Sequence, residues 1–262
     1  MGATLKELFI TVQVKLLQRL SRSGREGGEA YSTASNVAKG LGDTFLGSIA
    51  GKTVIDFGCG EGGAAIELAQ RGAERVIGID IREDVLRVAR QKARESSVDH
   101  ICCFTQSTRE RADIIISIDA FEHFAEPAGI LRAMDTLLKP EGEVAASFGP
   151  TWHHPLGGHL FSVFPWAHLI FSEEALIRWR SGFKTDGATR FGEVAGGLNQ
   201  ITIRRFERIV KESPFQFASL ELVPIRKLRW LHNRFTREFA TAVVRCRLVK
   251  RAGAGKAPAA TR

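Results

Sequence analysis

An α/β fold built around a doubly wound sheet of about seven strands is the architecture that the sequence predicts. Short apolar runs alternate with segments of helical spacing between residues 50 and 150. The clearest run, residues 53–57, leads through a glycine-rich turn straight into a helical segment at 64–69. Nearer the C-terminus, residues 217–222 and 241–248 alternate apolar with polar or basic side chains, as half-exposed strands do. A chain of 262 residues then holds one large core and no separate second domain.

The glycine-rich turn marks a ligand site. Glycine lets the backbone adopt conformations closed to other residues and lets a ligand press against the main chain. The turn satisfies two patterns at once, G-x-G-x-x-G through Gly58, Gly60 and Gly63, and D-x-G-x-G-x-G through Asp56, Gly58, Gly60 and Gly62. Both patterns predict a nucleotide-like ligand at the junction of strand and helix, and together they leave open which nucleotide it is.

Three later segments continue this arrangement. Residues 76–80 form a second strand that ends in Asp80, where a carboxylate can accept hydrogen bonds from both hydroxyls of a ribose. Residues 112–124 form a fourth strand and a loop that carries the pair Glu122 and His123. Residues 137–144 then lead from the end of a helix into a fifth strand.

As a set, these motifs resemble those of the class I methyltransferases that use S-adenosylmethionine, in particular small-molecule enzymes of the methyltransferase type 11-like kind. The D-x-G-x-G-x-G pattern is similar to motif I of that family, and the pair Glu122 and His123 is similar to its loop after strand four. The resemblance covers roughly residues 50 to 150. It implies a Rossmann-like sheet with an antiparallel edge strand, S-adenosyl-L-methionine as the cofactor, and methyl transfer to a small-molecule acceptor, with a hydroxyl oxygen as the expected receiving atom.

The resemblance also assigns a cofactor site. It places Asp56 near the charged amino acid end of the cofactor and Asp80 at the ribose. At the adenine the sequence departs from the family, because relatives usually carry an acidic residue soon after strand three, where this chain has Gln106 and Ser107. One of these two side chains, or the backbone, must then serve. The expected cofactor-binding residues are Asp56, Gly58, Cys59, Gly60, Gly62, Asp80, Ile81, Gln106, Ser107 and Asp119.

The remaining periodic segments complete the predicted order of elements. An amphipathic helix at residues 4–20 presents one apolar row, which we expect to pack on the core as a brace or lid. That row consists of Leu5, Leu8, Phe9, Val12, Leu16 and Leu20. A weaker helix is expected near 34–45, preceded by Tyr31, which either lines the cofactor site or simply packs. Further helices are expected at 84–93 and 127–138, and further strands at 101–104 and 143–147.

Residues 151–198 form an insertion between strand five and the next helix, which the apolar positions from Ile203 to Val210 mark. The insertion contains a helix at 173–180 with Ser172 as its cap. Ligands of doubly wound folds bind beyond the carboxyl ends of the strands, so an insertion that leaves from that edge would roof the pocket. The expected domains are an N-terminal helical lid (1–50), a cofactor-binding core (51–150), a substrate cap (151–198), the C-terminal part of the same core (199–250) and a disordered tail (251–262).

Histidines gather in the two loops that should face the acceptor. Methyl transfer from a sulfonium mainly requires alignment of donor and acceptor, but a hydroxyl acceptor must also lose its proton, which suits a histidine base. The candidates are His123, His159 and His154; His153 and His168 lie in the same stretch. His123 has an alternative role in bonding the loop backbone. No metal site is expected, because the spacing of these residues matches no ligand motif.

Composition and charge restrict the class of protein. The chain is 44% hydrophobic and 25% charged, and its four cysteines show no paired spacing, so neither a disulfide framework nor a zinc site is expected. Neither a secretory signal nor an apolar run long enough to span a bilayer is visible, which predicts a cytoplasmic protein. From residue 201 onward the chain has 15 Lys and Arg but only 4 Asp and Glu. This basic quarter is either a solvated face and tail or a surface for RNA, an anionic membrane or an acidic partner.

Three alternatives to a small-molecule methyltransferase stay open. An RNA methyltransferase could use the basic quarter, although the loop at 119–122 lacks the proline-aromatic signature of enzymes that methylate base amino groups. A nicotinamide-dependent dehydrogenase fits the G-x-G-x-x-G pattern. A binding protein that keeps the fold without the activity fits the altered adenine loop. The sequence leaves open the identity of the acceptor and the oligomeric state.

Overall fold

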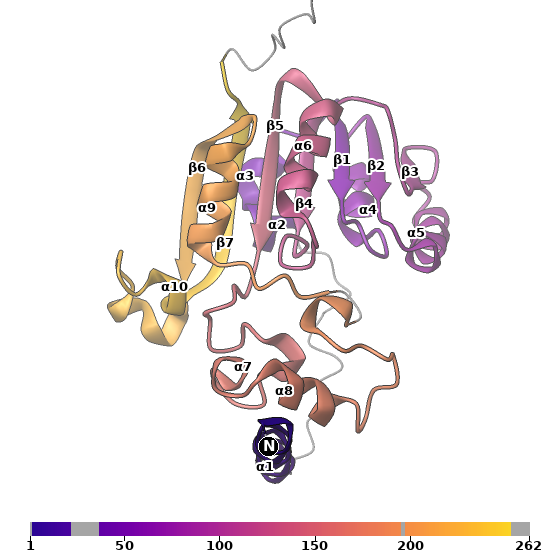
Figure 1. The fold of residues 1–262 in the computed structure, drawn as a ribbon. Helices are drawn as coiled ribbons and strands as arrows, with labels where there is room; N and C mark the ends of the chain where they lie inside the picture. Colours follow the sequence, from indigo (N-terminus) through magenta and orange to yellow (C-terminus); the bar gives the residue numbers. More distant parts are fainter. Residues whose placement is uncertain (1, 22–36, 195–196, 253–262) are drawn as a thin grey trace, which may run out of the picture.

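One seven-stranded sheet organises the protein (Figure 1). The computed structural model describes residues 2–21, 37–194 and 197–252, so Tyr31 and most of the predicted tail lie outside the described residues. The strand order is β3-β2-β1-β4-β5-β7-β6. The strands are β1 Thr53–Phe57, β2 Arg75–Ile79, β3 Cys102–Thr105, β4 Ala112–Ile118, β5 Leu138–Phe148, β6 Phe215–Pro224 and β7 Thr241–Lys250.

The first five strands pair in parallel, and β7 is antiparallel to both of its neighbours, β5 and β6. This confirms the predicted fold class, a doubly wound sheet of seven strands with antiparallel pairing at one edge. The strand order shows in addition that β6 lies outermost, with β7 between it and β5. The order reverses between β1 and β4, so the loops that follow these two strands meet at the switch point where such sheets bind ligands.

Helices cover both faces of the sheet and create two apolar cores. On one face lie α2 Val37–Leu41, α3 Asp43–Leu46, α4 Gly63–Gln70 and α5 Glu83–Glu95. On the other lie α6 Pro127–Leu137 and α9 Ile203–Glu212, whose buried Leu131, Met134, Phe206 and Val210 pack on the sheet. The strands at the centre of the sheet are therefore buried on both sides.

Strand β5 begins earlier than expected from the sequence. The sequence predicted a helix that ends at Leu138 and a strand that begins at Glu143, yet Leu138 pairs with Ala112, and the register shifts before Ile114 meets Glu143. Gly142 allows this irregular start, because a Cβ at this position would lie 2.7 Å from the carbonyl oxygen of Asp113. The strand consequently reaches the end of α6 without a separate turn.

The insertion after β5 folds into a cap that has a core of its own. It contains η1 His159–Phe161, α7 Ala167–Ile170, α8 Glu173–Arg180 and η2 Phe191–Glu193. Ser172 caps α8 as predicted, since its hydroxyl accepts a hydrogen bond from the Ala175 N–H at 3.3 Å. Buried side chains of the cap form a third cluster, which also takes in two residues of the N-terminal helix α1 Gly2–Leu20.

Helix α1 packs on the cap with a different face from the predicted one. All six side chains of the predicted apolar row are exposed, and the buried residues are Ile10, Gln13 and Leu17. Gln13 interrupts the apolar pattern of this second row in the sequence, which is why periodicity pointed to the other one. Its side-chain oxygen accepts a hydrogen bond from the Ser172 N–H at 2.8 Å, so the polar residue is satisfied at the contact with the cap.

The connection between β6 and β7 is longer than a hairpin turn and contains η3 Arg226–Leu231 and α10 Arg237–Ala240. Because β6 runs parallel to β5, this connection lies at the same edge of the sheet as the cap (Figure 1). Nowhere in the three described ranges is there a helix long and apolar enough to cross a membrane.

Candidate active site

In the turn between β1 and α4, which we call the glycine corner, the main chain is accessible to a ligand at one glycine. Gly58, Gly60 and Gly62 all have positive φ angles, of 87°, 51° and 79°. A Cβ on Gly62 would lie 2.7 Å from the ring of Phe104, and one on Gly58 would lie 2.9 Å from Ala120, so these two glycines permit close packing inside the protein. A Cβ on Gly60 would have nothing within 4 Å. Gly60 is therefore the position where a ligand can approach the backbone.

Asp80 anchors this corner. Its carboxylate accepts a hydrogen bond from the Gly60 N–H at 3.0 Å and another from the Arg82 N–H at 3.0 Å. The Arg82 guanidinium also donates to both carboxylate oxygens, at 3.0 and 3.1 Å. Burial acts to raise the pKa of Asp80, but the hydrogen bonds and charge of Arg82 outweigh it and lower the pKa. A ribose that binds Asp80 must take the place of the Arg82 side chain.

Arg82 is a residue of the site that sequence reasoning missed. Half of its side chain is exposed, whereas that of Asp80 is 6% exposed. The guanidinium thus lies on the solvent side of the carboxylate and can leave without disturbing the core. The sequence did carry a signal for this contact. Arg82 is a cation two residues after Asp80, close enough for its side chain to fold back onto the carboxylate.

Asp56 lies beneath the corner instead of on its open surface. The backbone of Ala65, in the first turn of α4, hydrogen-bonds to its carboxyl group, and burial raises the pKa of Asp56 to about 7. Its Oδ2 atom is enclosed and has no hydrogen-bond partner among the described residues. Cys59 is likewise buried, with its sulfur 3.7 Å from the carbonyl oxygen of Gly60.

Gln106, one of the two predicted adenine residues, contacts the backbone of an exposed apolar residue, Ile81. Ile81 is 85% exposed although it directly follows the buried Asp80. The Gln106 side-chain amide donates to the Ile81 carbonyl at 3.1 Å, and Ser107 follows in the same exposed loop after β3. An exposed apolar side chain next to Asp80, the predicted ligand of the ribose, is a surface that a purine ring can cover.

The two loops beyond β4 and β5 bring His123 and His159 together. Their rings are in edge contact, with centroids 5.3 Å apart. His123 Nδ1 lies 2.8 Å from the carbonyl oxygen of Gly197, so this nitrogen carries the proton and donates it. In the neutral ring Nε2 is then the basic nitrogen. Asp119 begins the same loop with a positive φ of 50°, and its N–H donates to the Ser147 carbonyl.

Two of the remaining histidines are held by hydrogen bonds within the cap. His154 Nδ1 accepts a hydrogen bond from the Leu156 N–H at 2.9 Å. His168 engages both nitrogens, with Nε2 2.7 Å from the Trp152 carbonyl and Nδ1 3.2 Å from the Ser162 hydroxyl. Burial, aided by neighbouring imidazoles, lowers the pKa of both His154 and His159 to about 4. Both rings are thus neutral at pH 7, and both are weak bases.

Glu122 and Asn199 join the loop after β4 to the end of the cap. The Asn199 amide donates to the carbonyls of Phe121 and Phe124, at 2.6 and 2.7 Å. The Asn199 N–H donates to the Glu122 carbonyl, while the Gly149 N–H donates to the Glu122 carboxyl. Complete burial raises the pKa of Glu122 to about 8. Sequence reasoning noted the pair Glu122 and His123 but gave Asn199 no role, because its partners lie more than 70 residues away.

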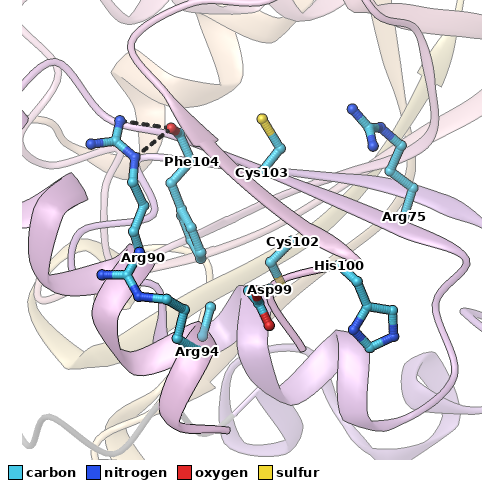
Figure 2. Close-up of a pocket in the computed structure, with 9 residues that line it drawn as sticks. Arg75, Arg90, Arg94, Asp99, His100, Cys102, Cys103 and Phe104 are labelled. Carbon is cyan, nitrogen blue, oxygen red and sulfur yellow. Dashed lines mark hydrogen bonds between the residues drawn. The ribbon is translucent and has the colours of Figure 1, made fainter. Parts of the chain in front are cut away.

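A surface hollow of about 460 Å³ lies elsewhere, against β3 and α5 (Figure 2). Arg75 and His100 stand at its rim near the amino ends of β2 and β3, away from the carboxyl ends where the candidate site lies. Its cations are already engaged: Arg90 donates to the Phe104 carbonyl and Arg75 pairs with Glu110. Among the described residues, no group of three or more His, Cys, Asp or Glu side chains is placed to hold a metal ion.

An open glycine corner with an anchored carboxylate, on a sheet of this strand order, defines the class of nucleoside-cofactor-binding Rossmann-like folds. A family model described as a methyltransferase domain matches residues 49–153. This part of the chain therefore matches a methyltransferase domain, in agreement with the resemblance of its sequence motifs to the class I, S-adenosylmethionine-dependent enzymes.

Curated relatives match the same part of the chain. A ubiquinone biosynthesis O-methyltransferase from Acinetobacter baylyi is 40% identical over 109 residues, which is 39% of this chain and 45% of that protein. Its counterpart from Stutzerimonas stutzeri is 41% identical over 105 residues, 37% of this chain and 44% of that protein. The matching region thus spans less than half the length of these relatives.

The solved structure of magnesium protoporphyrin IX methyltransferase from Synechocystis PCC 6803, with bound SAH, shares the fold across nearly the whole chain. The TM-score is 0.51 at 18% identity, covering 95% of this chain and 99% of that one. A methyltransferase from Mesorhizobium loti gives 0.52 at 16% identity, covering 79% and 96%. At these identities the likeness concerns the fold.

Proposed function

We propose that this protein is an S-adenosylmethionine-dependent methyltransferase that transfers the methyl group to a hydroxyl oxygen of a small molecule. The observation that carries the proposal is that the open Gly60 corner follows β1, while His123 and His159, whose rings are in contact, follow β4 and β5 at the same edge of the sheet. The curated relatives named as ubiquinone biosynthesis O-methyltransferases support transfer to oxygen.

The residues at the corner fit the proposed cofactor. Gly60 offers open main chain, Asp80 offers a charged acceptor for the ribose hydroxyls, and Ile81 offers an exposed apolar surface for the adenine. Asp56 contributes from beneath by holding the first turn of α4. When bound, the cofactor supplies a methyl group attached to a positively charged sulfur, and the neutral thioether that remains is a good leaving group.

His123 is the residue best placed to remove the proton of the acceptor. Its Nδ1–H is committed to the Gly197 carbonyl, which fixes the tautomer and the ring orientation, and Nε2 is then the nitrogen able to take a proton. His159 touches the same ring, and burial lowers its pKa to about 4, which makes it a weak base. We therefore propose His123 as the base and His159 as the residue that positions it, while His154 holds its own turn.

We propose that the two functions, cofactor binding and acceptor binding, belong to parts of the chain with separate apolar cores. Residues 51–150 hold the cofactor, and the cap at 151–198 covers the acceptor, with α1 bracing the cap through the third apolar cluster. Helices α2 and α3 pack on the sheet and so belong with the cofactor half. Trp152 and Trp166 stiffen the cap: Trp152 lies against His168 and Phe191, and the Trp166 indole donates to the His153 carbonyl.

Calorimetry with two titrants tests the proposal. S-adenosylhomocysteine should bind at micromolar concentration, and NADH should produce no heat. Radiolabelled S-adenosylmethionine, offered with a panel of phenols, amines and an RNA transcript, should label the phenols. Binding of NADH alone would instead indicate a dehydrogenase, and labelling of RNA alone would indicate a nucleic acid enzyme. Failure to bind S-adenosylhomocysteine at millimolar concentration would contradict the assignment of the corner.

A further inference from the structure

The connection between β6 and β7 carries an unusual exposed surface. We call residues 226–239 the basic-aromatic segment. Trp230 is 80% exposed and Phe235 is 71% exposed, and Leu231 and Phe239 are also exposed. A large aromatic side chain in water marks an interaction surface more often than a structural need, particularly where several lie within one short segment. The proposed methyl transfer makes no use of them.

Cations surround these aromatic residues. The segment holds five basic residues and one acidic residue. Glu238 is buried, and Arg237 pairs with Glu207. The other four, Arg226, Lys227, Arg229 and Arg234, are exposed and form no ion pair within the described ranges. The side chain of Arg234 lies over the Phe235 ring, 4.5 Å from its centroid. The surface therefore suits a partner that carries negative charge and accepts apolar side chains.

A second exposed apolar surface lies at the same end of the molecule. Helix α1 forms the far side of the cap, beyond α8 (Figure 1). Its outward row includes Leu8 and Phe9, which are 61% and 64% exposed. Between residues 8 and 21 the helix has no acidic residue, while Lys15 and Arg19 are exposed beside the apolar row. An apolar row flanked by cations is the pattern of helices that lie in a lipid interface.

We propose that the basic-aromatic segment and the outward row of α1 dock this protein on an anionic phospholipid surface. The four arginine and lysine side chains face the phosphate groups, and Trp230 and Phe235 enter the interface, where amphipathic aromatic rings are favoured. RNA would also use cations and aromatic rings, but it has no use for a row of leucine, valine and phenylalanine side chains on a helix. The row on α1 therefore favours lipid over RNA.

Sedimentation with vesicles tests the proposal. Full-length protein should bind equimolar phosphatidylcholine–phosphatidylglycerol vesicles at least about tenfold more tightly than phosphatidylcholine alone, and high salt should weaken the binding. Replacing the four cations by glutamine should remove that preference. The control replaces four exposed cations elsewhere and should bind like wild type. The test set is Arg226→Gln, Lys227→Gln, Arg229→Gln and Arg234→Gln; the control set is Lys52→Gln, Arg87→Gln, Arg94→Gln and Arg111→Gln.

Two further variants separate the contributions of the apolar groups. Trp230→Ala with Phe235→Ala should weaken binding to the mixed vesicles, and Phe9→Gln with Val12→Gln in α1 should do the same. Circular dichroism melting curves would show that each variant is folded. Equal binding of wild type and the four-glutamine variant to mixed vesicles would overturn the proposal. So would fluorescence anisotropy that shows RNA binding through the same four cations without vesicle binding, or a dimer, detected by ultracentrifugation, that the α1 variants dissociate.

Discussion

The glycine corner and the cap form their parts of the site in opposite ways. In the corner, main-chain groups provide the geometry: Gly60 exposes its backbone, and its N–H is held by Asp80. In the cap, side chains hold one another: His168 bridges Ser162 and the Trp152 carbonyl, and Arg180 is buried against Asp186.

This difference teaches which changes each region tolerates. The glycine corner depends on a few residues with positive φ angles, so few sequences can form it. The class of ligand that it binds can therefore be predicted from the glycine pattern. A cap made of interlocking side chains can be rebuilt with other side chains of similar volume. We expect the cofactor half to respond to single substitutions in affinity and the cap half to respond in turnover.

The largest expected effect concerns His123, at the boundary between the two regions. His123→Ala should lower kcat by about 10²- to 10⁴-fold, because the acceptor hydroxyl loses its base, while the affinity for S-adenosylhomocysteine is unchanged. His154→Ala is the matched control, because its Nδ1 serves a local turn. Steady-state kinetics with a phenol substrate and calorimetry measure both quantities. Full activity of His123→Ala would remove it from the mechanism.

Glu122 should make stability depend on pH. Burial raises its pKa in the folded protein to about 8, so the folded state holds a proton more tightly than the unfolded chain does. The free energy of unfolding should therefore fall as pH rises from about 5 to 8, by on the order of 3 to 4 kcal/mol from this group. Asp56, raised to about 7 by burial, contributes in the same direction.

Urea unfolding at several pH values measures this effect. Glu122→Gln should be less sensitive to pH over that range than wild type, because the amide cannot ionise. Glu212→Gln, at an exposed position on α9, serves as the control and should follow the wild-type curve. Parallel curves for wild type and Glu122→Gln would contradict the assigned burial of a protonated carboxyl group.

Asp80→Ala should weaken the binding of S-adenosylhomocysteine by at least about tenfold, because two charge-assisted hydrogen bonds to the ribose are lost. Titration calorimetry gives the affinity. Asp84→Ala is the control, since this carboxylate is exposed on the first turn of α5. Unchanged affinity of Asp80→Ala would mean that the ribose lies elsewhere.

The smallest effect is expected for Arg82. Its guanidinium occupies both oxygens of Asp80 and competes with the ribose, so Arg82→Ala should tighten cofactor binding. An ion pair with a half-exposed partner contributes less than about 1 kcal/mol, which limits the gain to roughly fivefold. Arg87→Ala, on the same helix as Asp84, should have no effect. Weaker binding by Arg82→Ala would show that the guanidinium contacts the cofactor itself.

Elements that depend on local pattern were predictable from sequence. The strand, glycine turn and helix at 53–70, the second strand to Asp80, and the Ser172 cap all follow from spacing and capping chemistry. What sequence could not supply were contacts between distant segments. Nothing local indicates that Asn199 donates to the loop at 121–124.

Helix α1 shows the same limit in another form. Its periodicity correctly predicted a helix but selected the wrong face for packing, because the buried row contains a glutamine that finds its partner in the cap. Hydrophobic spacing reports which side chains could be buried together. Which of two rows is buried depends on a surface that folds from residues more than 150 positions away.

The two hydrogen bonds that the Asn199 side chain donates couple movement of the cap to movement of the loop after β4. One amide group connects the returning end of the cap to the carbonyls on either side of Glu122 and His123. If the cap swings open to release product, it must either break both bonds or carry the imidazole away from the reacting atoms. If His123 is the base, as proposed, movement of the cap away from the sheet therefore also displaces the base, and we expect the open form of the protein to be inactive.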